Sequence, residues 1–91
     1  MAQESSQYQR KSVVFGLEIS GQFKAYPFDE LRKGPAQFTD EFQGHRFKVR
    51  YDDINQTAQI EGDDGHELPT LLFFWFAWYA FHPGTEIYTA N

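Results

Sequence analysis

The chain has 91 residues and a net charge of −5, from eight lysines and arginines against thirteen aspartates and glutamates. This length supports one domain with a single core. The acidic balance, with no run of basic residues longer than two, disfavours binding along a nucleic-acid backbone. The chain has no cysteine, which excludes a disulfide framework, a thiol nucleophile and a thiolate zinc site and leaves the cellular compartment unspecified.

The two ends of the chain are polar. Residues 1–11 show no hydrophobic periodicity, so we expect them to form a mobile tail, with a second short tail at residues 89–91. The first segment also lacks the apolar stretch of a secretory signal. The remaining residues, 12–88, are expected to fold as a single domain.

The first folded element is predicted to be a β-hairpin. Residues 13–20 alternate between large apolar side chains and smaller or polar ones, which is the period of a half-buried strand. Gly16 within this strand indicates a bulge or the close approach of another segment. A Ser-Gly turn then leads to a second extended segment at residues 22–26.

The register of this hairpin can be predicted from its side chains. A loop of two residues would place Glu18 opposite Phe23, whereas a loop of three residues places Ile19 opposite Phe23. Cross-strand pairs favour apolar against apolar, so we expect the three-residue loop.

A short helix and three further strands are predicted for the middle of the chain. Residues 28–33 place acids before bases and end at a Gly-Pro pair, which is typical of a short helix. Residues 37–42 and 47–51 form a predicted second hairpin around a Gln-Gly turn. A turn-rich segment then precedes one more short strand at residues 57–61.

The most apolar stretch runs from Leu71 to Phe81 and contains both tryptophans and four of the ten phenylalanines. It is too short to span a membrane, which takes about 20 residues, and it lacks the basic face of a helix that lies on a membrane. Its leucines and alanines favour a helix over about 70–82, with Thr70 as the N-cap and a final strand at 85–88.

These elements predict an α+β fold. We expect a curved, mostly antiparallel sheet of about five or six strands packed around one aromatic helix, with the short helix near 28–33 beside it. Helical spacing directs one stripe of the aromatic helix toward the sheet: Leu71, Phe74, Trp75, Trp78 and Phe81. The other side presents Phe73, Phe76 and Tyr79, which a single sheet cannot cover. A filled core is favoured over an aromatic pocket for a sugar or an apolar ligand.

Two blocks of the chain resemble a known family. They read VFGLEISGQFKAYPF at residues 14–28 and FWFAWYAFHPGTE at residues 74–86. They are similar to the bacterial and archaeal family known as domain of unknown function 3179, whose members carry Gly-x-x-x-x-Gly-x-x-x-Ala-Tyr-Pro and, in many cases, Trp-Phe-Ala-Trp-x-x-Phe-His-Pro-x-Thr. The resemblance covers the chain from about Val13 to Tyr88 and implies no particular activity, because the family has no established one.

The chain departs from this family in one segment. Many members carry Cys-Pro-x-Cys-Gly-x-Ala after a strand that ends in tyrosine, and the corresponding residues here are 51–58, with Asp52 and Asn55 at the cysteine positions. If the motif is redox-active or binds metal in the relatives, this chain lacks the thiolates that such chemistry needs. The resemblance therefore implies a cysteine-free variant without that chemistry.

No motif indicates a catalytic or metal site. The histidines, His45, His66 and His82, have no spacing typical of metal ligation with the acids around them. No serine lies in a nucleophile elbow, and no glycine-rich phosphate loop occurs. We expect no catalytic residue, metal or cofactor; acids cap turns, and His82 caps the C-terminus of the aromatic helix.

Two functional hypotheses follow. The preferred one is a non-catalytic structural or interaction module, often part of a longer protein, that self-associates or contacts other domains of a longer chain. Its candidate interaction surface is Phe73, Phe76 and Tyr79. The alternative is a ligand-binding or enzymatic domain with an open pocket near the C-terminus of the aromatic helix. Its candidate ligand-binding residues are His82, Glu86, Tyr26 and Tyr51.

Overall fold

The computed structural model describes residues 12–90, which form two four-stranded sheets and short helices. The first sheet has the order β7-β1-β2-β8 and the second the order β3-β4-β5-β6. The predicted tail at 1–11 and the last residue lie outside the described part, and residues 89–90 lie in no helix or strand. The elements are β1 (Val13–Ile19), β2 (Gln22–Pro27), α1 (Phe28–Leu31), β3 (Gln37–Phe42), β4 (His45–Asp52), β5 (Thr57–Gly62), β6 (Glu67–Leu68), β7 (Thr70–Phe74), α2 (Trp75–Phe81) and β8 (Glu86–Ile87).

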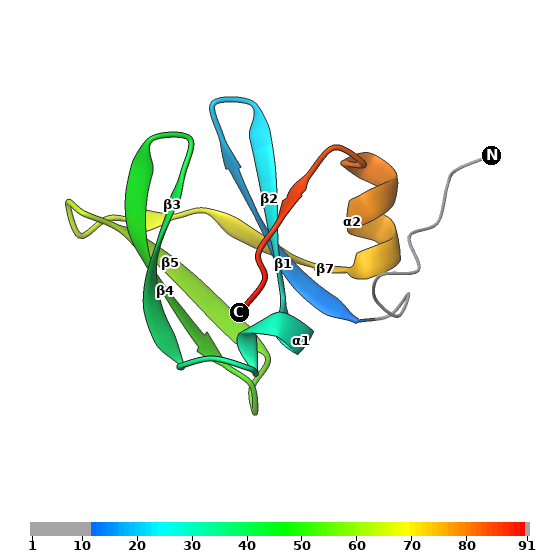
Figure 1. The fold of residues 1–91 in the computed structure, drawn as a ribbon, viewed down its shortest axis with the longest axis horizontal. Helices are drawn as coiled ribbons and strands as arrows, with labels where there is room; N and C mark the ends of the chain where they lie inside the picture. The colour runs from blue at the N-terminus through cyan, green and yellow to red at the C-terminus, as the bar shows by residue number, and fades with distance from the viewer. Residues whose placement is uncertain (1–11, 91) are drawn as a thin grey trace.

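The α+β class is confirmed, but the arrangement of the sheet differs from the prediction. Instead of one curved sheet of five or six strands around a helix, two sheets face each other, and α2 lies on the outer side of the first sheet (Figure 1). All strand pairs are antiparallel except β2 with β8, which is parallel. The difference arises because the chain crosses from one sheet to the other between β6 and β7, at Pro69, and a single sequence pattern does not reveal such a crossing.

The predicted register of the first hairpin is wrong. The loop has two residues, and Glu18 lies opposite Phe23. Ser20 and Gly21 both adopt positive φ, at 53° and 77°, as the tight two-residue hairpin turn requires. The apolar pairing rule did not discriminate here, because residues 24–27 of β2 are buried on both faces of the strand.

The predicted helix over 70–82 is also longer than the observed one. Residues 70–74 form β7, which pairs with β1, and the helix begins only at Trp75. Thr70 is therefore a strand residue and not an N-cap. The backbone N–H of Trp75 donates to the carbonyl of Ser12 at 2.7 Å. Aromatic residues suit strands well, and the edge of β1 that β2 does not cover offers hydrogen-bond partners that favour a strand over a helix at residues 70–74.

The remaining predicted elements are confirmed with small shifts. The second hairpin is β3 and β4, joined by Gln43 and Gly44 at positive φ, and the following strand is β5. The short helix α1 ends at Leu31, two residues earlier than predicted, and the final strand is the two-residue β8.

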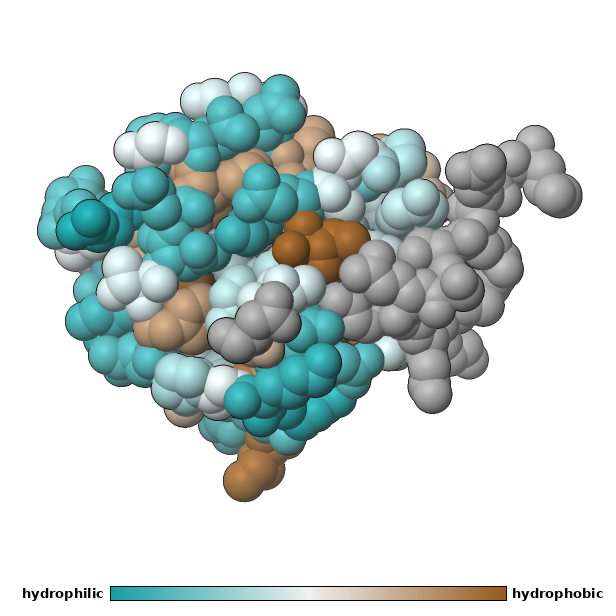
Figure 2. Space-filling model, viewed as in Figure 1, coloured by the Kyte–Doolittle hydropathy of each residue, from teal (hydrophilic) through white to brown (hydrophobic). Residues whose placement is uncertain are grey.

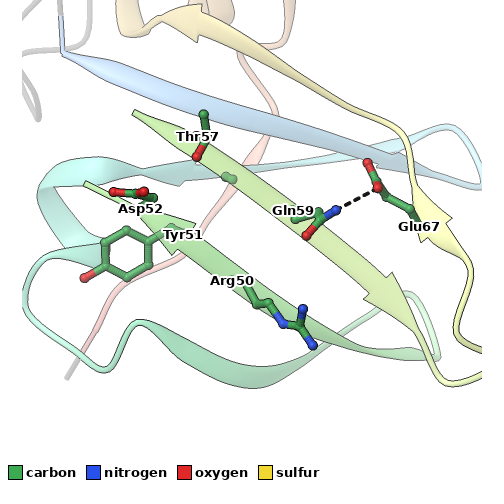
Figure 3. Close-up of a pocket in the computed structure, with 7 residues that line it drawn as sticks. Arg50, Tyr51, Asp52, Thr57, Gln59 and Glu67 are labelled. Carbon is green, nitrogen blue, oxygen red and sulfur yellow. Dashed lines mark hydrogen bonds between the residues drawn. The ribbon is translucent and has the colours of Figure 1, made fainter. Parts of the chain in front are cut away.

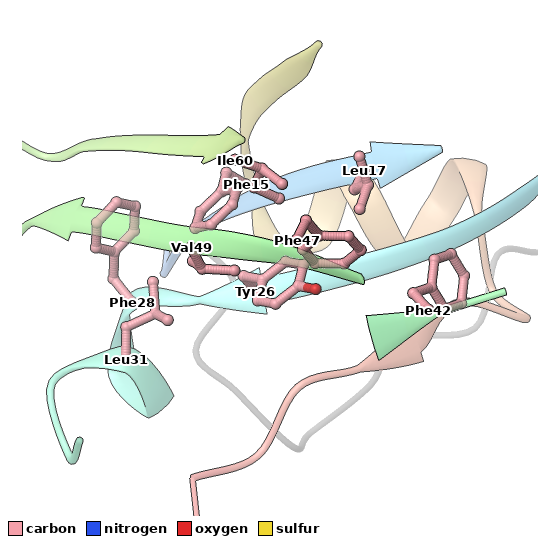
Figure 4. Close-up of a cluster of buried hydrophobic side chains, with 9 residues drawn as sticks. All are labelled: Phe15, Leu17, Tyr26, Phe28, Leu31, Phe42, Phe47, Val49 and Ile60. Carbon is pink, nitrogen blue, oxygen red and sulfur yellow. The ribbon is translucent and has the colours of Figure 1, made fainter. Parts of the chain in front are cut away.

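The main core lies between the two sheets (Figure 4). It contains nine buried side chains from β1, β2, α1, β3, β4 and β5: Phe15, Leu17, Tyr26, Phe28, Leu31, Phe42, Phe47, Val49 and Ile60. Phe15 stacks on Tyr26 with ring centroids 4.9 Å apart. We call this cluster the inner core. Burial of this much apolar surface is the dominant stabilising term for the fold.

A second, smaller cluster lies between the first sheet and α2. Its buried members are Val14, Ala25, Trp75 and Trp78. We call the packing of α2 on the sheet the outer layer. The prediction of a close approach at Gly16 is confirmed, because a Cβ at this position would lie 2.1 Å from Cζ3 of Trp78. Only glycine lets this indole lie directly on β1.

Candidate binding surface

The outer edge of β7 carries a group of exposed apolar side chains. Leu71 is 67% exposed, Leu72 is 51% exposed and Phe74 is 47% exposed. We call these three residues the β7 edge. Phe76 of α2, 40% exposed, stacks on Phe74 with ring centroids 6.2 Å apart and extends the apolar surface onto the helix. By contrast, most of the face of the molecule in Figure 2 is hydrophilic, with strongly hydrophobic areas limited to a central patch and the lower tip.

The backbone of the β7 edge is open as well. β7 is the terminal strand of its sheet, and no strand in the described part of the chain is hydrogen-bonded to its outer side. The backbone N–H of Trp75 donates to the carbonyl of Ser12, so these two residues form a hydrogen-bonded pair. Hydrogen-bonded and non-hydrogen-bonded pairs alternate along an antiparallel ladder, which makes Phe73 and Leu71 the next residues of β7 that bond to β1. The amides and carbonyls of Thr70, Leu72 and Phe74 therefore point away from β1 and toward any incoming strand.

The predicted interaction residues only partly coincide with this surface. Phe73 and Tyr79 are half-buried, and their rings lie 5.4 Å from those of Trp78 and Trp75 respectively. The predicted sheet-facing stripe is right for the two tryptophans and wrong for its other three members, all of which are exposed: Leu71, Phe74 and Phe81. Helical spacing failed at the first two because they belong to a strand, where side chains alternate between faces.

An aromatic pocket of about 490 Å³ lies beside the β7 edge, near the C-terminus of α2. It is lined by residues of β1, β2, β7 and α2 and of the segments that flank them. These residues are Gly16, Leu17, Glu18, Phe23, Pro69, Thr70, Leu71, Phe73, Trp78 and His82. Of the four candidate ligand-binding residues, only His82 reaches this pocket.

Trp78 is the central wall of the aromatic pocket and is held firmly. Its indole rests on Gly16, and its Nε1 donates to Oγ1 of Thr85 at 3.1 Å. The Thr85 hydroxyl in turn donates to the carbonyl of Phe23 at 3.2 Å. The ring of His82 stacks on that of Phe23 with centroids 3.8 Å apart, so this histidine packs on the sheet, while its backbone N–H closes the helix on Trp78.

Tyr26 and Glu86 belong to a different group of side chains, at the seam between the two sheets. Lys24 is buried, and its Nζ lies 2.7 Å from Asp40 of β3 and 3.3 Å from Glu86 of β8. The Tyr26 hydroxyl donates to the same Asp40 oxygen at 2.7 Å. We call these four residues the seam network. It joins strands of both sheets, and its lysine is too buried to reach a ligand.

The electrostatics of the seam network fit a structural role. Burial raises the pKa of Asp40, but hydrogen bonds from Lys24 and Tyr26 outweigh this effect and lower its pKa overall. Burial, followed by the hydrogen bond to Asp40, raises the pKa of Tyr26 far above its ordinary value. The carboxylate thus stays ionised and the phenol stays protonated, and neither is poised to exchange a proton near neutral pH.

Tyr51 lies in a third place, at a polar depression of about 420 Å³ over β4 and β5 (Figure 3). Its ring meets Phe28 edge-on, with centroids 6.2 Å apart. The lining side chains partly bond to each other, as Gln59 Nε2 does to Glu67 Oε1 at 2.9 Å. The four predicted ligand-binding residues therefore do not converge on one cleft.

Asp52, another residue of this depression, is engaged in the β4–β5 turn. It accepts hydrogen bonds from the backbone N–H groups of Ile54 and Asn55, at 3.0 and 3.2 Å, and from the side chain of Asn55 at 2.6 Å. These bonds lower the pKa of Asp52, the side-chain bond from Asn55 most strongly. Asp52 and Asn55, which the resemblance predicts to stand at cysteine positions, thus bond to each other and close the turn.

Other kinds of site can be checked over the described residues. Residues 12–90 contain no group of three or more histidines and carboxylates placed to hold a metal ion. No helix in this part of the chain has the length and apolar character needed to cross a membrane.

Comparison of the chain with protein-family models, with curated proteins and with solved structures found no match. The resemblance to domain of unknown function 3179 therefore stays a prediction. Within the fold, the two blocks that carry it do contact each other, where Gly16 supports Trp78 and Thr85 bonds to Phe23.

Proposed function

We propose that this protein is a non-catalytic interaction module that self-associates by pairing its β7 edge with that of a second copy. The observation that carries the proposal is an edge strand with open backbone groups and exposed apolar side chains at Leu71, Leu72 and Phe74. Such an edge is a template for strand addition, in which backbone hydrogen bonds supply affinity and neighbouring side chains supply selectivity.

The other edge strands of the described fold are protected against this kind of pairing. β6 and β8 have only two residues each, and β3 carries Asp40 and Glu41. Short strands and charged side chains are the usual means of blocking edge-to-edge association. β7 is longer than β6 and β8, with five residues, and carries no charged side chain. Its exposed apolar edge is thus the exception within this fold.

Charge does not oppose a second copy along the segment that contains β7. Each chain carries a net charge of −5, so two copies repel each other in most orientations. Residues 68–81 contain no charged side chain, and an approach through this segment keeps the acids of both copies apart. The segment Thr-Leu-Leu-Phe-Phe also suits a two-fold antiparallel pair, because the register centred on Leu72 sets Leu72 opposite its own copy and Leu71 opposite Phe73.

Sedimentation equilibrium over a range of protein concentrations tests the proposal. We expect a monomer–dimer equilibrium for the natural chain and a monomer at all concentrations for Leu72→Lys, because the new ammonium would meet its own copy across the two-fold axis. A natural chain that stays monomeric up to millimolar concentration would refute self-association.

Ile54→Lys is the matched control. Ile54 is 93% exposed at the turn between β4 and β5, so the substitution removes an aliphatic side chain even more exposed than Leu72 and adds the same charge far from β7 in the sequence. We expect this variant to dimerise as the natural chain does. Equal weakening by both lysines would indicate association through general hydrophobicity or charge, and not through the β7 edge.

A further inference from the structure

We propose that the aromatic pocket binds a small organic cation, of the class of substituted ammonium ions with a compact apolar head. The pocket shares Leu71 with the β7 edge, but it lies between β7, β1, β2 and α2, and its occupation does not depend on self-association. It rests on the size of the pocket, on its aromatic walls and on a single carboxylate at its rim.

The pocket has the dimensions and composition of a small-molecule site. Its volume of about 490 Å³ falls within the range of about 300–1,000 Å³ that such sites occupy. Most of its lining is apolar, and the few polar side chains are Glu18, Thr70 and His82. A neutral sugar would need more hydrogen-bonding groups than these three supply, whereas a compact ion with an apolar surface needs few.

Aromatic rings from β2, β7 and α2 contact one another along one wall of the pocket. Trp78 lies 6.0 Å from Phe23 and 5.4 Å from Phe73, measured between ring centroids, and the three rings are inclined to one another by 77° and 58°. The rings therefore meet edge to face and do not form a flat stack. Aromatic rings attract cations through their quadrupoles, tryptophan most strongly, and gain more where water is excluded.

The carboxylate at the rim favours a positively charged ligand. Among the described residues, Glu18 is the only aspartate, glutamate, lysine or arginine that lines the pocket. It lies on the same face of the sheet as Phe23, directly opposite it in the β1–β2 ladder, and no described residue forms an ion pair or hydrogen bond with its carboxylate. Lys24, the neighbour of Phe23 in sequence, points to the other face and is bound to Asp40 and Glu86.

The test compares choline with 3,3-dimethylbutan-1-ol, which has the same shape but a carbon in place of the charged nitrogen. Titrations by calorimetry, with the indole N–H of Trp78 followed by NMR, use the Leu72→Lys chain so that self-association plays no part. We expect saturable 1:1 binding of choline at the pocket, about tenfold tighter than that of the alcohol, as a cation–π site of this kind provides.

Glu18→Gln keeps the shape of the rim and removes its charge. We expect it to weaken choline binding about fivefold or more and to leave binding of the alcohol unchanged. Glu41→Gln, an equally exposed strand position on β3, is the matched control and should leave both ligands unaffected. Equal affinity for choline and the alcohol, no saturable choline binding, perturbed resonances only outside the pocket, or an unchanged Glu18→Gln variant would each overturn the proposal.

Discussion

The inner core and the outer layer are built from the same aromatic and aliphatic residue types, yet only the inner core is closed. Sheets cover the inner core from both sides, and its nine members are almost inaccessible to solvent. In the outer layer, a helix of only seven residues covers part of the first sheet, and apolar side chains remain exposed along β7 and at the end of α2.

This difference separates stability from binding. A closed cluster gains its full burial energy within one chain, whereas an open one leaves apolar surface for a partner or a ligand. The exposed apolar surface does not mean that the outer layer as a whole is poorly packed. Trp75 and Trp78 are buried, and Gly16 leaves the space that the indole of Trp78 occupies. The exposed apolar surface of the outer layer comprises the β7 edge, the rim of the aromatic pocket, and Phe76 and Phe81 of α2.

The largest expected difference between the two regions is in the cost of truncating a phenylalanine. Phe47→Ala leaves a cavity between the sheets, and we expect it to lower the free energy of unfolding by about 3–5 kcal/mol. Phe81→Ala, at a site that is 72% exposed, should change it by less than about 1 kcal/mol. Urea denaturation followed by circular dichroism measures both, and similar losses for the two variants would contradict the division into closed and open regions.

The next effect concerns the support of the outer layer. Gly16→Ala places a methyl group where Trp78 lies, so the indole must move and α2 with it. We expect a loss of about 1–3 kcal/mol, typical of overpacking, together with a red shift of tryptophan fluorescence. Gly84→Ala is the control, since its Cβ would meet no atom within 4 Å. A Gly16→Ala chain as stable as the control, with unshifted fluorescence, would argue against the contact.

A smaller and pH-dependent effect is expected at the seam network. The folded pKa of Asp40 lies below its ordinary value of 3.8, so its stabilising contribution is complete above that value and is lost as the pH falls through the lower folded value. Asp40→Asn should cost about 1–2 kcal/mol at neutral pH and show a shallower loss of stability in acid than the natural chain. Asp63→Asn, at an exposed position, serves as control; parallel acid profiles for both variants would show that the seam carboxylate contributes nothing specific.

Much of the fold could be predicted because, in a strand with one apolar face, apolar and polar residues alternate along the sequence. The two hairpins and β5 were found in this way, and the helix after Pro27 was found from its acids, its bases and the Gly-Pro pair that follows them. The register at Glu18 and the boundary between β7 and α2 were not, since the first depends on the left-handed conformation of Ser20 and the second on the vacant edge of β1. Neither is a property of local hydrophobicity.

The candidate site was predicted less well than the fold. His82 was placed near the end of the helix, and the structure puts it in the aromatic pocket, but Tyr26 and Glu86 belong to the seam network and Tyr51 lies over β4. Glu18 and Phe23 were missed because their proximity follows from the hairpin register. The exposed leucines of β7 were missed because they were assigned to a helix; the segment Thr-Leu-Leu-Phe-Phe, interpreted as a strand, would have indicated them.

The most direct test of the account is amide hydrogen exchange along β7 as a function of protein concentration. The amides of Leu72 and Phe74 point away from β1, and no strand within residues 12–90 pairs with them. Pairing with a second copy predicts that their exchange slows as concentration rises, while the amides of Leu71 and Phe73, which bond to β1, keep the same protection. Exchange at Leu72 and Phe74 that is fast at every concentration would contradict a binding role for the β7 edge.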